Sequence, residues 1–183
     1  MRENRSESGG ASPWRVPIAI EDVAETGRHF DLAADADERT AVARMADLRD
    51  LPRLEANFDV TRYGNGGLRV VGRVCATVGQ TCVVTLEPLA NEVEEAIDLV
   101  FAPRPEPEAG AKNAETGKET LAENWDGPEP LIGGVVDLGA LAVEFLVLGL
   151  DPYPRKPGAV FQPPADRPEN EGPFAALARL KKG

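Results

Sequence analysis

Apolar and polar residues alternate through much of the first half of the chain, which is the pattern of half-buried β-strands. The alternation is most regular over 54–64 and 68–78. Residues 65–67 (Asn-Gly-Gly) separate these runs and favour a hairpin turn, because Asn and Gly accept positive φ. Two further runs, 81–89 and 91–103, also indicate strands. The four runs predict an antiparallel meander with one face on a core.

The same alternation predicts which side chains face that core. In the last strand, Glu94 and Asp98 are expected to point to solvent, whereas Glu95 lies among the inward apolar residues. Such a sheet needs a cover, which helices elsewhere in the chain can provide. The expected inward residues of the meander are Leu54, Ala56, Phe58, Val60, Leu68, Val70, Gly72, Val74, Ala76, Val93, Ile97, Leu99 and Phe101.

Two shorter strands and a helix are expected before the meander. A period of two over 14–20, and a weaker one over 28–34, indicate the strands. Residues 35–50 predict a short helix that Asp35 or Asp37 could cap. The residues near one face of this helix are Val42, Met45 and Leu48.

A second helix is expected over 137–149. Asp137 is a plausible N-cap and Gly149 a plausible C-cap. Several faces of this helix are apolar, which predicts that it is largely buried against the sheet or a partner. Its apolar residues include Leu138, Leu141, Val143, Phe145, Leu146, Val147 and Leu148.

The fold class that follows is α+β: an antiparallel sheet or partly closed barrel packed with a few helices. We expect a single domain over 14–160, in which the Pro-, Glu- and Gly-rich residues 102–130 form a mobile acidic loop. Residues 1–13 predict a disordered arm, and 161–183 predict a linker with a short C-terminal helix.

The C-terminal helix has two possible roles. Over 173–183, apolar Phe174, Leu177 and Leu180 recur at spacing three, and Lys181 and Lys182 follow. A helix of this length is marginal alone in water, so we expect it to dock on something. It either closes its own domain or anchors a partner from the end of a linker.

The charge of the chain limits its partners. The 31 acidic residues outnumber the 20 basic ones, which gives a net charge of -11. Phosphate backbones repel such a chain, whereas basic proteins are attracted to it. No apolar run approaches the ~18 residues of a membrane span. The polar N-terminal stretch lacks the apolar core of a secretory signal, so we expect a cytoplasmic protein that does not bind membranes.

No residue pattern indicates catalysis, a cofactor or a metal. The only histidine, His29, is accompanied by no nucleophile motif, and the glycines near 64–67 do not have the spacing of a phosphate loop. Cys75 and Cys82 are too few for a four-ligand zinc site, and a disulfide would need an oxidising compartment. We interpret both cysteines as small buried apolar residues.

Three stretches carry a resemblance to a known family. They are "TCVVTLEPL" (81–89), "VDLGALAVEFLVLGLDPYP" (136–154) and "GPFAALARLKKG" (172–183). In order and spacing the chain resembles the bacterial YceD family, described as large ribosomal RNA subunit accumulation proteins, with relatives in plastids. Many members carry a Cys-x-x-Cys pair in the first stretch. Here Cys82 keeps the first position and Thr85 stands at the second, so any zinc site formed by the family's pairs is lost.

The resemblance implies a non-catalytic role in large ribosomal subunit biogenesis and 23S rRNA accumulation. The net charge favours a basic ribosomal protein, an assembly factor or a pre-ribosomal particle as partner over direct rRNA binding. Two alternatives stay open: a metal-dependent hydrolase acting on RNA or nucleotides, and a one-to-one chaperone-like adaptor for a basic ribosomal protein. The candidate partner-binding residues are Glu87, Pro88, Glu144, Pro152, Pro154, Phe174, Leu177, Leu180, Lys181 and Lys182.

Overall fold

A computed structural model describes residues 12–103 and 127–161 of the chain. Its elements, in chain order, are β1 (Pro17–Ala19), η1 (Ile20–Asp22), β2 (Arg28–Ala33), α1 (Ala36–Met45), β3 (Asp50–Tyr63), β4 (Gly67–Thr81), β5 (Pro88–Ala102), β6 (Glu129–Pro130), η2 (Ile132–Gly134), β7 (Val135–Asp137) and α2 (Leu138–Leu148).

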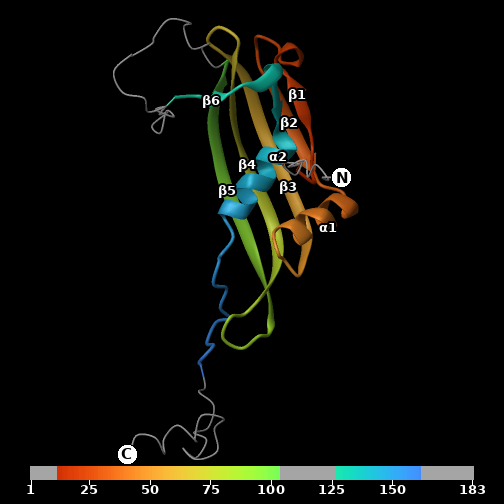
Figure 1. Cartoon of the computed structure of the whole chain (residues 1–183), viewed down its shortest axis with the longest axis vertical. Helices are drawn as coiled ribbons and strands as arrows, with labels where there is room; N and C mark the ends of the chain where they lie inside the picture. Colours follow the sequence, from red (N-terminus) through yellow and green to blue (C-terminus); the bar gives the residue numbers. More distant parts are fainter. Residues whose placement is uncertain (1–11, 104–126, 162–183) are drawn as a thin grey trace, which may run out of the picture.

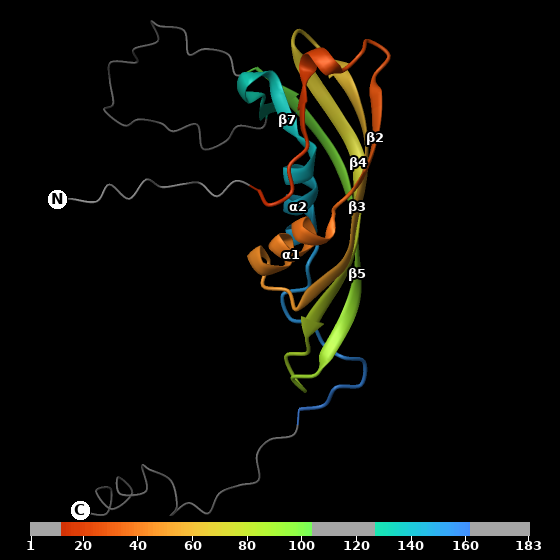
Figure 2. The same cartoon turned by 90° about the vertical axis from the view of Figure 1, so that its right-hand side faces the viewer.

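Three long strands dominate the architecture. The main sheet has the order β2-β3-β4-β5-β6, and all its pairs are antiparallel except the short parallel pair β5–β6. Strands β1 and β7 form a separate antiparallel pair. Both α-helices lie on the same side of the curved main sheet (Figures 1 and 2). Among residues 12–103 and 127–161 the sheet does not close, so the expected α+β fold is confirmed in its open-sheet form and not as a partly closed barrel.

The buried face of the sheet follows the predicted alternation. Leu54, Phe58, Val70, Val74 and Ile97 are at most 1% exposed, and they contact one apolar cluster. Gly72 lies opposite Phe58 in the β3–β4 register. A Cβ there would lie 2.6 Å from the Phe58 ring and collide with the Asn57 carbonyl oxygen, so a glycine is required for this close approach.

Both helices begin with an aspartate cap. The Asp35 carboxylate accepts hydrogen bonds from the amides of Asp37 and Glu38, and the Glu38 side chain accepts one from the Asp35 amide. Asp137 Oδ1 accepts from the Ala140 amide at 3.1 Å and from the Val16 amide at 2.8 Å. Asp137 therefore starts α2 and also holds the segment that leads into β1.

Four predictions about elements are wrong in part. The strand predicted over 81–89 does not exist as such: β4 continues to Thr81, residues 82–87 form a turn, and β5 begins at Pro88. The first strand is only three residues long. The helix predicted over 35–50 ends at Met45, and Met45 is 52% exposed. Leu148 of α2 is 71% exposed.

The remaining predicted segments fall mostly outside the described residues. This is the case for the arm 1–13 and for the linker and helix of 161–183. Of the loop predicted over 102–130, Ala102 ends β5 and residues 129–130 form β6.

Candidate functional site

A turn at one end of the sheet contacts a second segment that lies far from it in the sequence. The turn is residues 82–87, hereafter the Cys82 turn, and the second segment is residues 151–158, which follow α2 and are hereafter the exit segment. Within the turn, the Cys82 amide donates to the Glu87 carbonyl oxygen at 2.8 Å. The Val83 amide donates to the carbonyl oxygen of Pro154 in the exit segment at 2.9 Å. A backbone hydrogen bond therefore joins the two segments.

The Cys82 thiol lies at the centre of this junction. Its side chain is fully buried, and Sγ accepts hydrogen bonds from the Lys156 amide at 3.3 Å and the Thr85 amide at 3.4 Å. The Lys156 amide, followed by the hydroxyl and amide of Thr85, lowers the pKa of Cys82 from its ordinary 9.0 to about 6. The prediction that Cys82 is buried is confirmed, but the residue also accepts hydrogen bonds that favour a thiolate.

An ion pair closes the junction on its solvent side. Lys156 Nζ lies 2.9 Å from Glu87 Oε2, and the Thr85 hydroxyl donates to the same carboxylate oxygen at 3.3 Å. The hydrogen bond from Lys156 lowers the pKa of Glu87, and the same contact raises the pKa of Lys156. Both side chains are half-exposed, so the pair contributes modestly to stability.

The junction does not fit a zinc ion. A structural zinc site needs four ligands, most often thiolates and imidazoles. At the junction the donor set is one thiol, whose lone pairs face two backbone amides, and Thr85 occupies the second position of the turn. Among residues 12–103 and 127–161, no three His, Cys, Asp or Glu side chains are grouped to hold a metal ion. In this chain, hydrogen bonds and an ion pair join the two segments.

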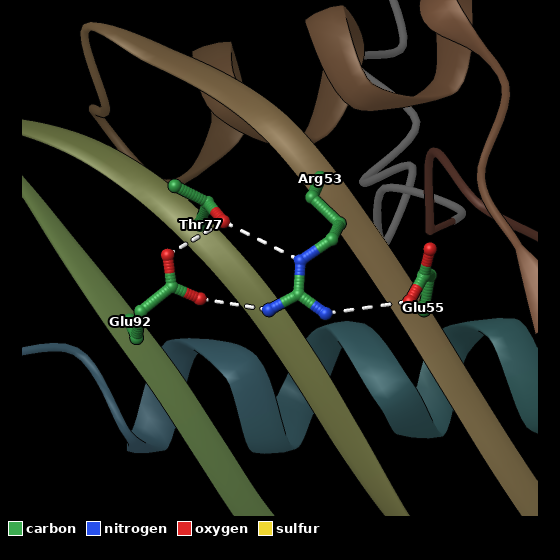
Figure 3. Close-up of polar contacts among 4 residues, drawn as sticks. All are labelled: Arg53, Glu55, Thr77 and Glu92. Atoms are coloured by element: carbon green, nitrogen blue, oxygen red, sulfur yellow. Dashed lines mark hydrogen bonds and ion pairs between the residues drawn. The ribbon is translucent and has the colours of Figure 1, made fainter.

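The solvent face of the sheet carries a network of charged side chains centred on Arg53 (Figure 3). The guanidinium of this β3 residue lies 2.7 Å from Glu92 of β5 and 3.3 Å from Glu55 of β3. Thr77 of β4 donates to Glu92 Oε1 at 2.8 Å. The hydrogen bond from Thr77 and then that from Arg53 lower the pKa of Glu92. The network therefore spans three neighbouring strands.

Further pairs continue along β4 and β5. Arg73 lies 2.7 Å from Glu94, and Arg69 makes a forked contact with Asp98 at 2.8 and 3.0 Å. The prediction that Glu94 and Asp98 point to solvent is confirmed. Cys75, expected to be buried, is instead partly exposed on this face, because it alternates with the inward residues of β4.

The single histidine also lies on the solvent face. His29 Nδ1 is 2.7 Å from Asp59 and Nε2 is 3.2 Å from Asp31. The hydrogen bonds to Asp59 and then Asp31 raise the pKa of His29. The ring is half-exposed and neither hydroxyl nor thiol is among its hydrogen-bond partners, so its geometry is that of a surface ion pair.

The candidate partner-binding residues fall into three groups. Glu87 ends the Cys82 turn and Pro88 follows it, and both are exposed; Pro152 is exposed in the exit segment. Pro154 is buried and holds the Val83 amide through its carbonyl oxygen, and Glu144 lies exposed on α2. The structure thus brings Glu87, Pro88, Pro152 and Pro154 together at one end of the molecule. The others, Phe174, Leu177, Leu180, Lys181 and Lys182, lie outside the described residues.

Sequence reasoning missed two residues of these networks. Lys156 closes the Cys82 junction from 74 residues away in the chain, and no local pattern indicates that contact. Arg53 bridges three strands, but only the final register places it beside Glu92. Both contacts depend on the tertiary structure and not on the local sequence.

No helix among residues 12–103 and 127–161 is long and apolar enough to cross a membrane.

The comparisons with known proteins bear on the predicted family. Residues 70–181 match the family described as "Large ribosomal RNA subunit accumulation protein YceD". This match runs from β4 through β5 and α2 to near the C-terminus, which is more than half of the chain, and it confirms the predicted resemblance. No curated protein and no solved structure shows significant similarity to the chain. The chain belongs to the YceD family of large ribosomal RNA subunit accumulation proteins.

Proposed function

We propose that this protein is a non-catalytic, cytoplasmic accessory factor in large ribosomal subunit biogenesis, and that it acts by binding a basic protein partner or a pre-ribosomal particle. The family match carries the proposal, since the family description links its members to the accumulation of large-subunit rRNA. The net charge of -11 supports a basic protein as the direct ligand, because phosphate backbones would be repelled.

The solvent face of the sheet is rich in carboxylates, which favours contact with a basic partner. In the ion pairs on the solvent face of the sheet, six carboxylates outnumber three arginines and one histidine. The carboxylates are Asp31, Glu55, Asp59, Glu92, Glu94 and Asp98. Glu87, Pro88 and Pro152 at the end of the sheet, and Glu144 on α2, remain our candidates for direct contact. Charged residues of this kind favour specificity and fast association more than raw affinity.

Two other functions make different predictions. A metal-dependent hydrolase would need clustered carboxylates, and the described residues offer no such group. A one-to-one adaptor would bind a single ribosomal protein away from the ribosome. Native mass spectrometry of the isolated complex separates this adaptor from a factor that binds a pre-ribosomal particle.

The experiment is affinity capture of the tagged full chain from its own cells, with and without RNase, followed by mass spectrometry. We expect large-subunit proteins or assembly factors to remain bound after RNase treatment. Loss of all ribosomal material with RNase, together with tight, steeply salt-dependent binding of purified large-subunit rRNA, would show that RNA is the ligand.

A further inference from the structure

A groove lies where the end of α1, the end of β4 and the exit segment meet. Its volume is about 680 Å³, larger than hollows of about 380 and 310 Å³ elsewhere on the described surface. We call it the exit groove. Its apolar lining comes from three separate parts of the chain: Leu48, Val83, Val147, Leu150, Pro152 and Pro154.

Part of the apolar lining of the exit groove is open to solvent. Val83 is 46% exposed and Val147 is 42% exposed, and Leu148 and Tyr153 beside them are 71% and 70% exposed. Single exposed apolar residues are ordinary, but a group of them around a hollow marks a binding surface. The groove is therefore shaped for an occupant with apolar side chains.

The rim of the groove favours a cationic occupant. Asp47 and Asp151 are carboxylates of the lining, and Arg49 is its one cation among the described residues. Glu144 is exposed one helical turn before Val147. The groove also lies at the C-terminal end of α2, where the helix dipole favours positive charge.

The C-terminal sequence has the complementary composition. Over 173–183 it carries Phe174, Leu177 and Leu180 at spacing three, together with Arg179, Lys181 and Lys182, and it has no acidic residue. This combination is one apolar stripe with a cationic end. Asp151, Pro152 and Pro154 of the exit segment line the groove, and the described part of the chain ends only seven residues later, at residue 161.

The connection is long enough to allow a return. Eleven residues, 162–172, separate the described part from the segment. Extended, they reach about 36 Å, whereas residue 161 follows Pro154 of the groove lining by seven residues and so lies at most about 25 Å from it. Because a segment of this length is marginal as a helix alone, burial in a groove would stabilise it.

We propose that residues 173–183 bind in the exit groove of their own chain as a short amphipathic helix. Leu177 and its apolar neighbours face Val147, Leu150 and Val83, and the lysines lie toward the acidic rim. This inference does not depend on the ribosomal role. It does mean that a partner that binds the C-terminal segment must first displace it from the groove.

Hydrogen exchange of the full chain, read by mass spectrometry of its peptides, tests the proposal. We expect the amides of 176–182 to exchange at least about tenfold more slowly than in a synthetic peptide of residues 172–183. Val147→Lys places a charge in the groove and should return these amides to the rate of the peptide. Ile132→Lys adds the same charge at a residue that is 80% exposed and outside the groove lining, and should change nothing.

Leu177→Asp provides a second variant that alters only the segment, and it should abolish the protection as well. Exchange at the free-peptide rate in the unmodified chain overturns the proposal. So does protection that survives Val147→Lys, because the contact would then lie elsewhere. Protection that rises with protein concentration, together with a dimer mass in light scattering, would assign the groove to a second copy and overturn binding within one chain.

Discussion

The Cys82 thiol combines two properties that have opposite effects on its reactivity. Its hydrogen bonds to the amides of Lys156 and Thr85 favour the thiolate, which is the reactive form of cysteine. Its complete burial keeps reagents away from it. We therefore attribute to Cys82 a structural role, in which the sulfur accepts hydrogen bonds and holds the turn against the exit segment.

Replacement of Lys156 by proline or alanine tests this role. Lys156→Pro removes the amide hydrogen that contributes most to the low pKa, whereas Lys156→Ala removes the ammonium and keeps the amide. In a Cys75→Ser background, we expect the pKa of Cys82 to move from about 6 toward 9 in the proline variant and to change much less in the alanine variant. Thiolate absorbance at 240 nm, measured against pH, gives both values.

The same pair of variants makes a prediction about stability. The pKa of Cys82 is lower in the folded chain than in the unfolded one, so the unfolded state binds more protons between pH 6 and 9. This contribution to stability is present above pH 9 and is lost as the pH falls through about 6. Urea unfolding across this range should show a smaller rise in the proline variant, and equal rises in both variants would contradict the assignment.

His29 provides a second titration, with the opposite sign. Its contacts with Asp59 and Asp31 raise its pKa above the ordinary 6.5, so its contribution to stability is full below pH 6.5 and is lost as the pH rises through the raised value. Because the chain has only one histidine, NMR titration of the ring proton is unambiguous. Asp59→Asn should lower the pKa toward 6.5. An unchanged pKa would mean that the 2.7 Å contact does not persist in solution.

The long elements could be predicted from local sequence, and the junctions between them could not. Alternation located β3 to β5 and their buried faces, and aspartate caps located both helices, because each signal lies within a few residues. The local sequence wrongly predicts a strand at the Cys82 turn because Val83 and Val84 extend an apolar run, whereas in the structure Leu86 adopts a positive φ of 59°. The contact of Cys82 with Lys156 spans 74 positions, so no local pattern reveals it.

The two N-caps allow a comparison between helices. Asp137 caps α2 and also accepts from the Val16 amide and pairs with Arg15 at 3.1 Å, whereas Asp35 bonds only within the first turn of α1. We expect Asp35→Ala to lower the free energy of unfolding by about 1 kcal/mol. Asp137→Ala should lower it by about 2–3 kcal/mol, because a cap and a cross-link are lost together. Chemical denaturation measures both, and equal losses would show that the β1 contact adds nothing.

The two faces of the whole molecule differ in composition. The helices cover one side of the sheet, as Figure 2 shows, and the other side carries the paired charges of β3, β4 and β5. Exposed pairs of this kind add little stability. Their sum leaves an acidic surface, and the acidity of the whole chain steers a basic partner from a distance without fixing where it binds.

Two charge reversals separate steering from direct contact. Glu144→Lys and Glu129→Lys change the net charge equally, but Glu144 lies on α2, one helical turn before Val147 of the exit groove, whereas Glu129 lies in β6, at the end of the sheet opposite the exit segment (Figure 1). If the partner binds at the candidate contact residues Glu87, Pro88, Glu144 and Pro152, Glu144→Lys should reduce capture of proteins extracted from large ribosomal subunits roughly five- to tenfold. Glu129→Lys should show only the smaller loss due to net charge. Both chains should unfold at the same temperature, since both glutamates are exposed. Equal losses of capture would mean that steering alone attracts the partner, and the contact surface would then have to be sought on the charged face of the sheet.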